Sequence, residues 1–465
     1  MDMKLEAGSW KFGPLLVLSF FAGSVALAEQ FTGPAEWRQV STNAVKAWNA
    51  GQQNRISPQV AVWPGVVADR QRREVRLLAE AVGHHLGITT EFLLVGPMSD
   101  RAYESAAVTV AKPGDIARAV ESLGLSLGGG VGSRPFRFWP YGERVVATVR
   151  RLDVAGAAEK PLQSLIRDAE PASPLFGEGG LVFTGGRWDG AGASRACLTD
   201  TNMPSSVISL YNEASTIFDV PFQVGQSEVY GRLTLAETLP CGALMEVVLR
   251  PLVSSDGKPR ALRLTVTAGM QRQEIALTCA GSDGAVLKQG GLADVLSWLR
   301  AQAEQGRELF VTLGLDDALS LKQAADVARV FAMLDGKGVK LDGKTDQGLF
   351  PRAFMPQEKW REREGRSPQP FELHIAEDAS GKMSKKLVFI EEDWNVKGLD
   401  PKLTPCEYPF ETWGELPGLV TKTGGKDCKV TLLFVFVPAG MPLGRFMPGV
   451  RAVADQLPLV YVFSE

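Results

Sequence analysis

A strand–helix–strand–helix pattern occurs twice near the C-terminus of this chain, and it restricts the fold there more than any other feature. In each occurrence an apolar helical stripe leads to a buried strand after 17 residues, from 292 to 309 and from 413 to 430. The next helix begins 11 residues later in the first occurrence and 12 in the second (309 to 320, 430 to 442). Short loops alone produce similar spacings, but the agreement of two steps favours an internal duplication. The sequence therefore predicts two tandem αβ modules, over 271–345 and 386–465, separated by a charged, proline-bearing excursion at 346–385.

Capping signals set the helix boundaries within these modules. Ser320 and Gln323 have the spacing of a capping box, in which the Ser side chain bonds the N3 amide and the Gln reaches back. Gly336 is placed to end that helix. In the second module Pro442 stands where Ser320 stands in the first, and Pro417 and Pro448 fall inside the expected helices. We therefore expect the second copy to be less regular.

Strand and helix signals also alternate between residues 59 and 165, which predicts an α/β domain after an N-terminal segment at 29–58. Residues 172–270 are richer in Gly, Ser and Thr and carry short apolar runs between turns, which predicts an all-β, sandwich-like domain. The expected fold class is thus α/β plus β in a multi-domain chain. A helix is expected to begin at Pro113, and another at 69–87, whose shared apolar face would be Val75, Leu78, Ala81, Val82 and Leu86.

The first 28 residues have the features of a cleavable export signal. Lys4 and Lys11 precede an uncharged run at 14–28, which ends in Ala26-Leu27-Ala28. That run is shorter than the roughly 20 residues that a helix needs to cross a bilayer. The acidic residues Asp2 and Glu6 leave open an uncleaved membrane anchor. The sequence favours cleavage after Ala28 and a periplasmic or secreted mature chain beginning at Glu29.

The composition narrows the class of function. Net charge is −3, with acidic and basic residues interspersed, so there is no basic face of the kind that nucleic-acid binders carry. The apolar fraction of 45% is ample for several cores. No segment after the signal is long and apolar enough to predict an integral membrane span.

Residues 270–342 resemble the periplasmic domain of ExbD/TolR-type biopolymer-transport proteins, and 386–463 resemble it in topology only. The similarity lies in EIALTCAGSDGAV, GGLADVLSWLRAQ and the stretch from ELFVTLGL to GKGVKL, with Asp316 and Asp317 at a strand exit. In that family the proton-coupling carboxylate lies on a transmembrane helix, whereas 14–28 contains no Asp or Glu. The resemblance therefore implies a small envelope α/β module that makes protein or cell-wall contacts, not the energised function.

Five cysteines follow the signal, in a compartment where disulfides form. Cys406 and Cys428 are close in sequence and are the first candidate pair. Cys241 and Cys279, taken to flank neighbouring strands, are the second, and Cys197 would remain. The alternative is that all are buried thiols that pack as small apolar side chains.

No catalytic residue, metal ligand or cofactor site is assigned from the sequence. Residues 338–345 match the P-loop formula, but they follow a helix where the chemistry needs a preceding strand. The histidines are His84, His85 and His374, and adjacent His84 and His85 cannot both bind one metal from a regular helix. Two aromatic clusters, 136–141 and 394–413, are read as core or as surfaces that stack on sugars or peptides. A carboxyl pair cannot be located, because its separation is a three-dimensional quantity.

The sequence thus favours a non-catalytic envelope protein that acts by protein or cell-wall contacts, accessory to a biopolymer-transport-like system. The alternative is a secreted hydrolase of envelope glycans or peptides that uses a carboxyl pair. The expected partner is an envelope protein or cell-wall polymer, and the oligomeric state is left open.

Overall fold

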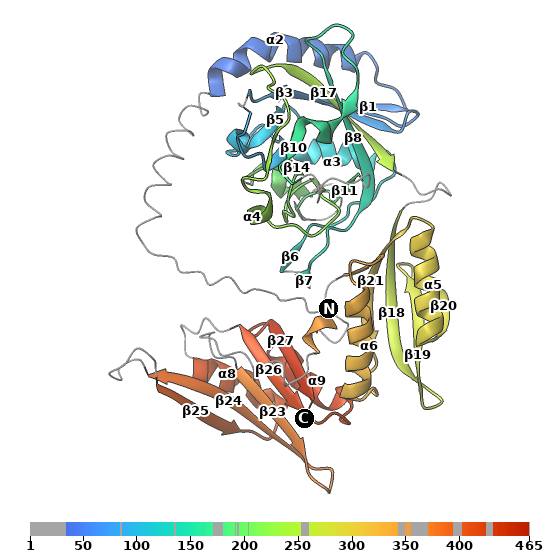
Figure 1. The fold of residues 1–465 in the computed structure, drawn as a ribbon, viewed down its shortest axis with the longest axis vertical. Coiled ribbons are helices and arrows are strands. Elements are labelled where there is room, and N and C mark those ends of the chain that lie inside the picture. The colour runs from blue at the N-terminus through green and yellow to red at the C-terminus, as the bar shows by residue number, and fades with distance from the viewer. Residues whose placement is uncertain are drawn as a thin grey trace. The chain divides into compact units, whose positions relative to one another are not determined.

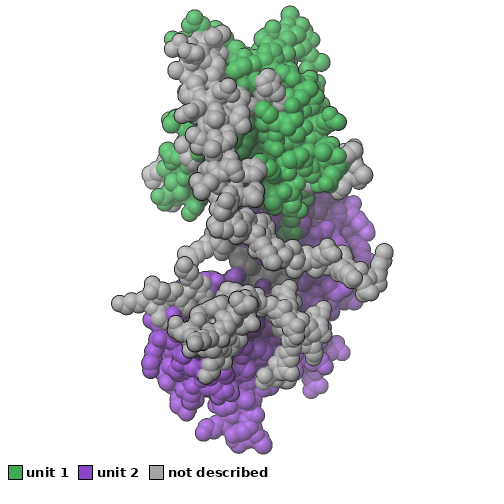
Figure 2. Space-filling model, turned by 60° about the vertical axis from the view of Figure 1, so that its left-hand side comes forward, with its two compact units in different colours: residues 1–130, 140–252 green, residues 131–139, 253–465 purple. Residues whose placement is uncertain are grey.

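A computed structural model shows a mixed α/β protein with several sheets, as the sequence predicts. It describes residues 34–83, 86–133, 136–170, 180–190, 192, 195–202, 204–252, 260–342, 349, 351–354, 371–393, 402–424 and 431–464. The chain forms two compact units (Figure 2). Unit 1 comprises residues 1–130 and 140–252, and unit 2 comprises 131–139 and 253–465.

Unit 1 is organised by a single large sheet that closes on itself (Figure 1). Strand β3 pairs with β17 on one side and with β5 on the other, so the strands from β3 round to β5 form a ring. In order, the ring consists of β3 (Glu74–Ala81), β17 (Leu244–Leu252), β8 (Glu143–Arg151), β11 (Leu181–Phe183), β15 (Phe218–Asp219), β14 (Ser206–Ser209), β4 (Phe92–Val95) and β5 (Ser105–Thr109). Strands β1 (Val60–Trp63) and β2 (Val66–Asp69) extend the sheet from β3.

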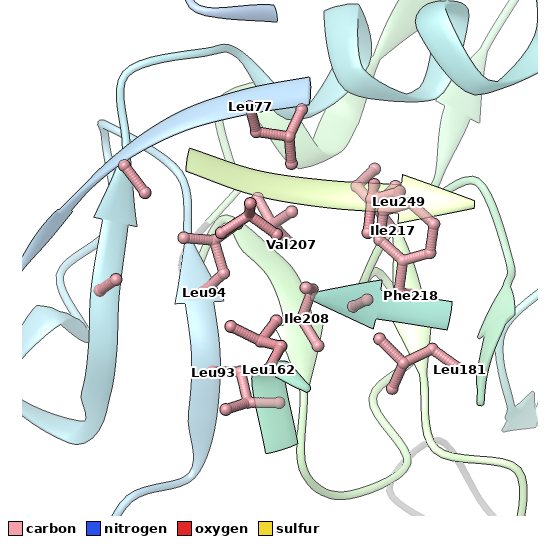
Figure 3. Packing of buried hydrophobic residues seen from close by; sticks show 14 of the residues in the cluster. Leu77, Leu93, Leu94, Leu162, Leu181, Val207, Ile208, Ile217, Phe218 and Leu249 are labelled. Atoms are coloured by element: carbon pink, nitrogen blue, oxygen red, sulfur yellow. The ribbon is translucent and has the colours of Figure 1, made fainter. Parts of the chain in front are cut away.

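Apolar side chains from these strands fill a shared core (Figure 3). Leu77, Leu94, Ile208, Phe218 and Leu249 come from five different strands, and each is at most 1% exposed. Burying each such side chain stabilises the fold by about 1.5–3 kcal/mol. Helix α3 (Pro113–Glu121) begins at Pro113, as predicted, and packs against β2 and β3.

The helix predicted at 69–87 is wrong, because this segment forms the β2–β3 hairpin. Val75, Leu77, Ala79 and Ala81 alternate along the chain and all face the core, which is the period of a strand. Both faces of β3 are covered, so Leu78 and Glu80 are buried too. Those extra apolar positions gave the false helical stripe.

The predicted boundary between 59–165 and 172–270 does not separate two domains. Strand β17 from the second segment pairs with β3 and β8 from the first. The boundary at 270 is also wrong, since β18 (Ala261–Gln271) belongs to a sheet of unit 2. The change in composition near 172 reflects shorter strands and longer loops within the same sheet. Composition reports local structure, whereas strand pairing between distant segments decides which residues share a domain.

Unit 2 contains two five-stranded sheets with the same topology, one over each predicted αβ module. The predicted bounds are wrong: the first module begins before residue 271, and part of the excursion predicted at 346–385 forms strands of the second sheet, at 371–377 and from 383. Both sheets have two antiparallel pairings followed by two parallel pairings. The first module is β18, β19 (Glu274–Gly281), β20 (Val286–Gly291), α5 (Leu292–Glu304), β21 (Glu308–Leu315), α6 (Leu321–Leu334) and β22 (Val339–Leu341). The second is β23 (Phe371–Glu377), β24 (Met383–Asp393), β25 (Lys402–Pro409), α8 (Leu416–Gly424), β26 (Leu432–Val437), α9 (Leu443–Ala452) and β27 (Leu459–Ser464).

The modules are joined by reciprocal backbone hydrogen bonds at the starts of α6 and α9. Leu321 N donates to Met441 O at 2.8 Å, and Leu443 N donates to Leu319 O at 2.9 Å. Residues 319 and 321 correspond to 441 and 443 in the two modules, so the contact is the same in both directions. An apolar core is continuous across both modules. The contact therefore has the form of an isologous interface within one chain.

Helix boundaries in unit 2 follow the capping signals. The predicted capping box at α6 is confirmed: Gln323 N donates to Ser320 Oγ at 3.3 Å, and Ser320 N donates to Gln323 Oε1 at 2.9 Å. Pro417 lies in the first turn of α8, where a missing N–H costs little. Pro448 lies inside α9.

No helix in the described ranges has the length and apolarity that a membrane span requires. The export signal predicted at 1–28 lies outside the described residues.

Candidate functional site

Of the cysteine pairs predicted from sequence, neither forms a bond in the described part of the chain. Cys197, Cys241, Cys279 and Cys406 are free thiols, and Cys428 lies outside the described residues. The premise for the second pair is wrong, because Cys241 precedes β17 in unit 1 whereas Cys279 lies on β19 in unit 2. Cys279 is wholly buried, and burial raises the pKa of its thiol to about 11, which fits the alternative of a small apolar side chain.

Other sequence candidates are part of the framework of unit 2. His374 stacks on Phe436 with ring centroids 4.6 Å apart, and its Nε2 lies 2.8 Å from Glu372 Oε2. His84 and His85 lie outside the described residues. Asp316 accepts from the Ala318 amide in a turn. The aromatic residues Tyr408, Phe410 and Trp413 pack into the apolar core, as one of the two readings predicts.

The concentration of carboxyls and phenols in unit 1 is the candidate site, which we call the carboxyl–tyrosine cluster. Topology places its members at one end of the closed sheet. Strands β4 and β5 are parallel, β14 is antiparallel to β4, and β14 is parallel to β15. The starts of β4 and β5 therefore meet the ends of β14 and β15. The cluster consists of Glu91, Arg101, Tyr103, Glu104, Tyr211, Glu213, Asp219 and Gln226.

Glu91 and Glu104 form a carboxyl pair at the starts of β4 and β5. Glu91 N donates to Glu104 O at 2.8 Å, which holds the two backbones together. Glu91 is 1% exposed. Burial raises the pKa of Glu91, and the negative charge of Glu104 raises it further.

Polar partners orient this pair. Gln226 Nε2 donates to Glu91 Oε2 at 2.8 Å. Arg101 Nη1 donates to Glu104 Oε2 at 2.9 Å and lies 3.1 Å from the Tyr103 hydroxyl. Gln226 comes from α4 (Gln226–Val229) and Arg101 immediately precedes η1 (Ala102–Glu104), so loops on two sides fix the carboxyls.

Glu213 and Asp219 form a second acidic pair: Glu213 lies on the segment that joins β14 to β15, and Asp219 is the last residue of β15. Asp219 is fully buried, and its Oδ1 accepts from Val220 N at 2.7 Å and Asn212 Nδ2 at 3.2 Å. Glu213 Oε1 accepts from the Ser215 amide at 3.2 Å and the Ser215 hydroxyl at 2.5 Å. Burial raises the pKa of both carboxyls, and the charge of Glu213 adds to the increase for Asp219.

Two tyrosines complete the cluster. Tyr211 and Tyr103 are both half-buried. The Tyr211 ring meets Phe92 edge-on with centroids 5.6 Å apart. Burial raises the pKa of Tyr211, and the charges of Glu213 and Glu91 raise it further. The phenol thus senses both acidic pairs, which ties them into one electrostatic site.

Sequence reasoning assigned none of these residues, because they are far apart along the chain. Glu91 and Glu213 become neighbours of one tyrosine only when β4 pairs with β14. The available signal was weak: a polar side chain directly before or after a short apolar run. Such positions mark strand ends, but the sequence does not reveal which strand ends meet.

The comparisons with known proteins do not identify this chain. No family model matches it, and no curated protein matches it. A structure titled as a prototype foamy virus protease–reverse transcriptase mutant matches with 8% identity over 44% of this chain and 36% of its own, with a TM-score of 0.14. That similarity is too low to support an argument about fold or function. The resemblance of 270–342 to ExbD/TolR-type domains stays a prediction.

Proposed function

We propose that this chain is a non-catalytic protein of the cell envelope that binds a cell-wall polymer or an envelope protein through the carboxyl–tyrosine cluster. One observation carries the proposal: the half-buried rings of Tyr103 and Tyr211 lie among carboxyls at one end of the closed sheet. A tyrosine combines an apolar ring with a hydroxyl and is enriched where proteins bind partners. Carboxyl oxygens accept hydrogen bonds from hydroxyl, amide and ammonium groups.

The hydrogen bonds within the cluster support recognition over proton transfer. Gln226 and Asn212 are amides, Ser215 is a hydroxyl, and Arg101 keeps its charge at all physiological pH values. These partners fix the carboxyls before any ligand arrives, which lowers the entropic cost of binding.

The envelope location rests on the export signal that the sequence predicts before Glu29. The resemblance of the αβ modules to ExbD/TolR-type domains supports a role as an accessory to a biopolymer-transport-like system. In that role the modules of unit 2 would contact protein, while the cluster of unit 1 would contact the wall or a second partner.

The test is co-sedimentation of the full chain with purified cell-wall sacculi, together with crosslinking in envelope extract. Tyr103→Ala should weaken capture about tenfold, the loss expected for an aromatic contact residue. Tyr230→Ala is the matched control, because Tyr230 is an exposed tyrosine of unit 1 outside the cluster. Absence of wild-type capture, or equal capture of both variants at unchanged thermal stability, would contradict the proposal.

A second candidate is a hydrolase of envelope glycans or peptides, and the Glu91–Glu104 contact favours it. A carboxyl whose pKa is raised by burial is suited to act as a general acid. A second carboxyl, that of Glu104, acts electrostatically on Glu91, and paired carboxyls whose pKa values differ can divide the acid and base roles between them. Turnover of any member of a glycan or peptide panel, abolished in Glu91→Gln, would favour this candidate over pure binding.

A further inference from the structure

The carboxyl–tyrosine cluster carries more acid than base. Glu91, Glu104, Glu213 and Asp219 contribute four carboxyls, and the basic side chain that contacts them in the described part of the chain is Arg101. Arg101 pairs with Glu104 and so serves the first acidic pair. For the Glu213–Asp219 pair, the described hydrogen-bond donors are neutral amides and hydroxyls.

Oxygen atoms in the second pair are buried without a partner. Asp219 Oδ2 is inaccessible and makes no hydrogen bond with the described residues, although the residue is fully buried. The same holds for Glu213 Oε2, beside which the Ser206 hydroxyl donates instead to Thr216 Oγ1 at 2.8 Å. Buried polar atoms are normally satisfied, so these two oxygens indicate a missing donor or positive charge.

A buried carboxylate without a countercharge costs several kcal/mol, and either a proton or a cation can remove that cost. A proton neutralises one carboxyl, whereas a bound cation neutralises both members of a pair at once. Carboxylate oxygens are preferred ligands of hard divalent cations, and they also accept from ammonium groups. Nearby tyrosine rings favour a cation as well.

We propose that the carboxyl–tyrosine cluster binds a cation, with Asp219 Oδ2 and Glu213 Oε2 as its oxygen donors. This rests on the proposed function and deepens it, because it names the ligand class of the same site. The cation is either a hard metal ion or the ammonium group of a wall or protein ligand, and both use the same donor oxygens.

The experiment is isothermal titration of the full chain at pH 7.5 and constant ionic strength, with calcium chloride, magnesium chloride and 1,5-diaminopentane as separate probes. We expect saturable binding of one probe class, which distinguishes a metal from an ammonium ligand. Asp219→Asn and Glu213→Gln should each weaken that binding at least tenfold. Asp326→Asn is the control, since Asp326 is an exposed carboxyl of unit 2 that should not affect it.

Two results would overturn the proposal: no saturable binding of any probe, or wild-type affinity in both Asp219→Asn and Glu213→Gln. If Asp219→Asn does not fold, Glu213→Gln alone decides, because that residue is only partly buried. Cation binding without any wall or protein capture would refute the proposed function and leave the cation site standing. Wall or protein capture that is unchanged by added cations and by both substitutions would support the proposed function and refute the cation site.

Discussion

The two units of this protein differ in what they bury. Every buried polar or charged side chain among the described residues lies between Asp69 and Glu246, in unit 1. The buried side chains described in unit 2 are apolar, apart from the thiol of Cys279. Buried polar groups reduce stability unless they are fully hydrogen-bonded, so a chain that concentrates them in one unit retains them there for a reason other than stability.

The two units also differ in how they are built. Unit 2 repeats one topology twice and joins the copies through matching hydrogen bonds, with the apolar core continuing across the joint. Unit 1 gathers Glu91, Asp219 and their partners at one end of a closed sheet. Under the proposed function, unit 1 would carry the ligand-binding chemistry, whereas the continuous apolar core of unit 2 contributes to stability.

The largest effect is expected where a carboxyl is introduced into unit 2. Val311 is 1% exposed within the apolar core, and Val311→Asp would bury a charge there without the donors that Asp219 has in unit 1. We expect a loss of at least about 4 kcal/mol in the unfolding free energy of unit 2, with unit 1 unaffected. Urea unfolding followed by hydrogen exchange in each unit measures this.

Val311→Thr is the control for this change, because it keeps the shape of the side chain and replaces one methyl group with an uncharged hydroxyl. Its cost should be about 1–3 kcal/mol. If unit 2 accepts Val311→Asp with a cost no larger than that of Val311→Thr, the contrast between the two cores is not real.

A smaller effect is expected in how the unfolding free energy of each unit depends on pH. The pKa of Asp219 is raised above its ordinary value of 3.8 by burial, so the folded state binds this proton more tightly than the unfolded state. Its contribution to stability is complete below pH 3.8 and is lost as pH rises through the raised pKa. Over that interval the unfolding free energy of unit 1 should fall by about 1.4 kcal/mol per pH unit relative to Asp219→Asn.

Unit 2 is the internal reference for this measurement, which requires buffer free of divalent cations. Its unfolding free energy should be the same in wild type and Asp219→Asn at each pH. Parallel pH profiles of unit 1 in the two proteins would show that Asp219 titrates alike in the folded and unfolded states.

Sequence reasoning succeeded where local signals decide the structure. The capping box at Ser320 and the helix from Pro113 follow from residues within one or two turns of each other. The order of strands and helices in the αβ modules follows from apolar spacings within each element. It failed at β3, where apolar residues on both faces produced a helical spacing. It also failed to pair β17 with β3 and β14 with β4, because these partners are more than a hundred residues apart in sequence. The missed β4–β14 pairing is the one that hides the cluster.

The smallest effect tests whether turns contribute to the contrast between the units. In unit 2 the β18–β19 hairpin turns at Arg272 and Gln273, with φ of 50° and 70°, and in unit 1 the β2–β3 hairpin has Arg73 at φ 52°. Most side chains with a Cβ are strained by roughly 1 kcal/mol in this left-handed region, whereas Gly, which has no Cβ, and Asn, whose short polar side chain can hydrogen-bond locally, accept it. Arg272→Asn with Gln273→Gly should therefore stabilise unit 2 by about 1 kcal/mol, and Arg73→Gly should stabilise unit 1 by a similar or smaller amount. If both units gain similar stability, turn strain does not distinguish them and the contrast lies in their cores. If only one unit gains stability, turn strain contributes to the contrast. Thermal unfolding of each unit, resolved by hydrogen exchange, provides the measurement.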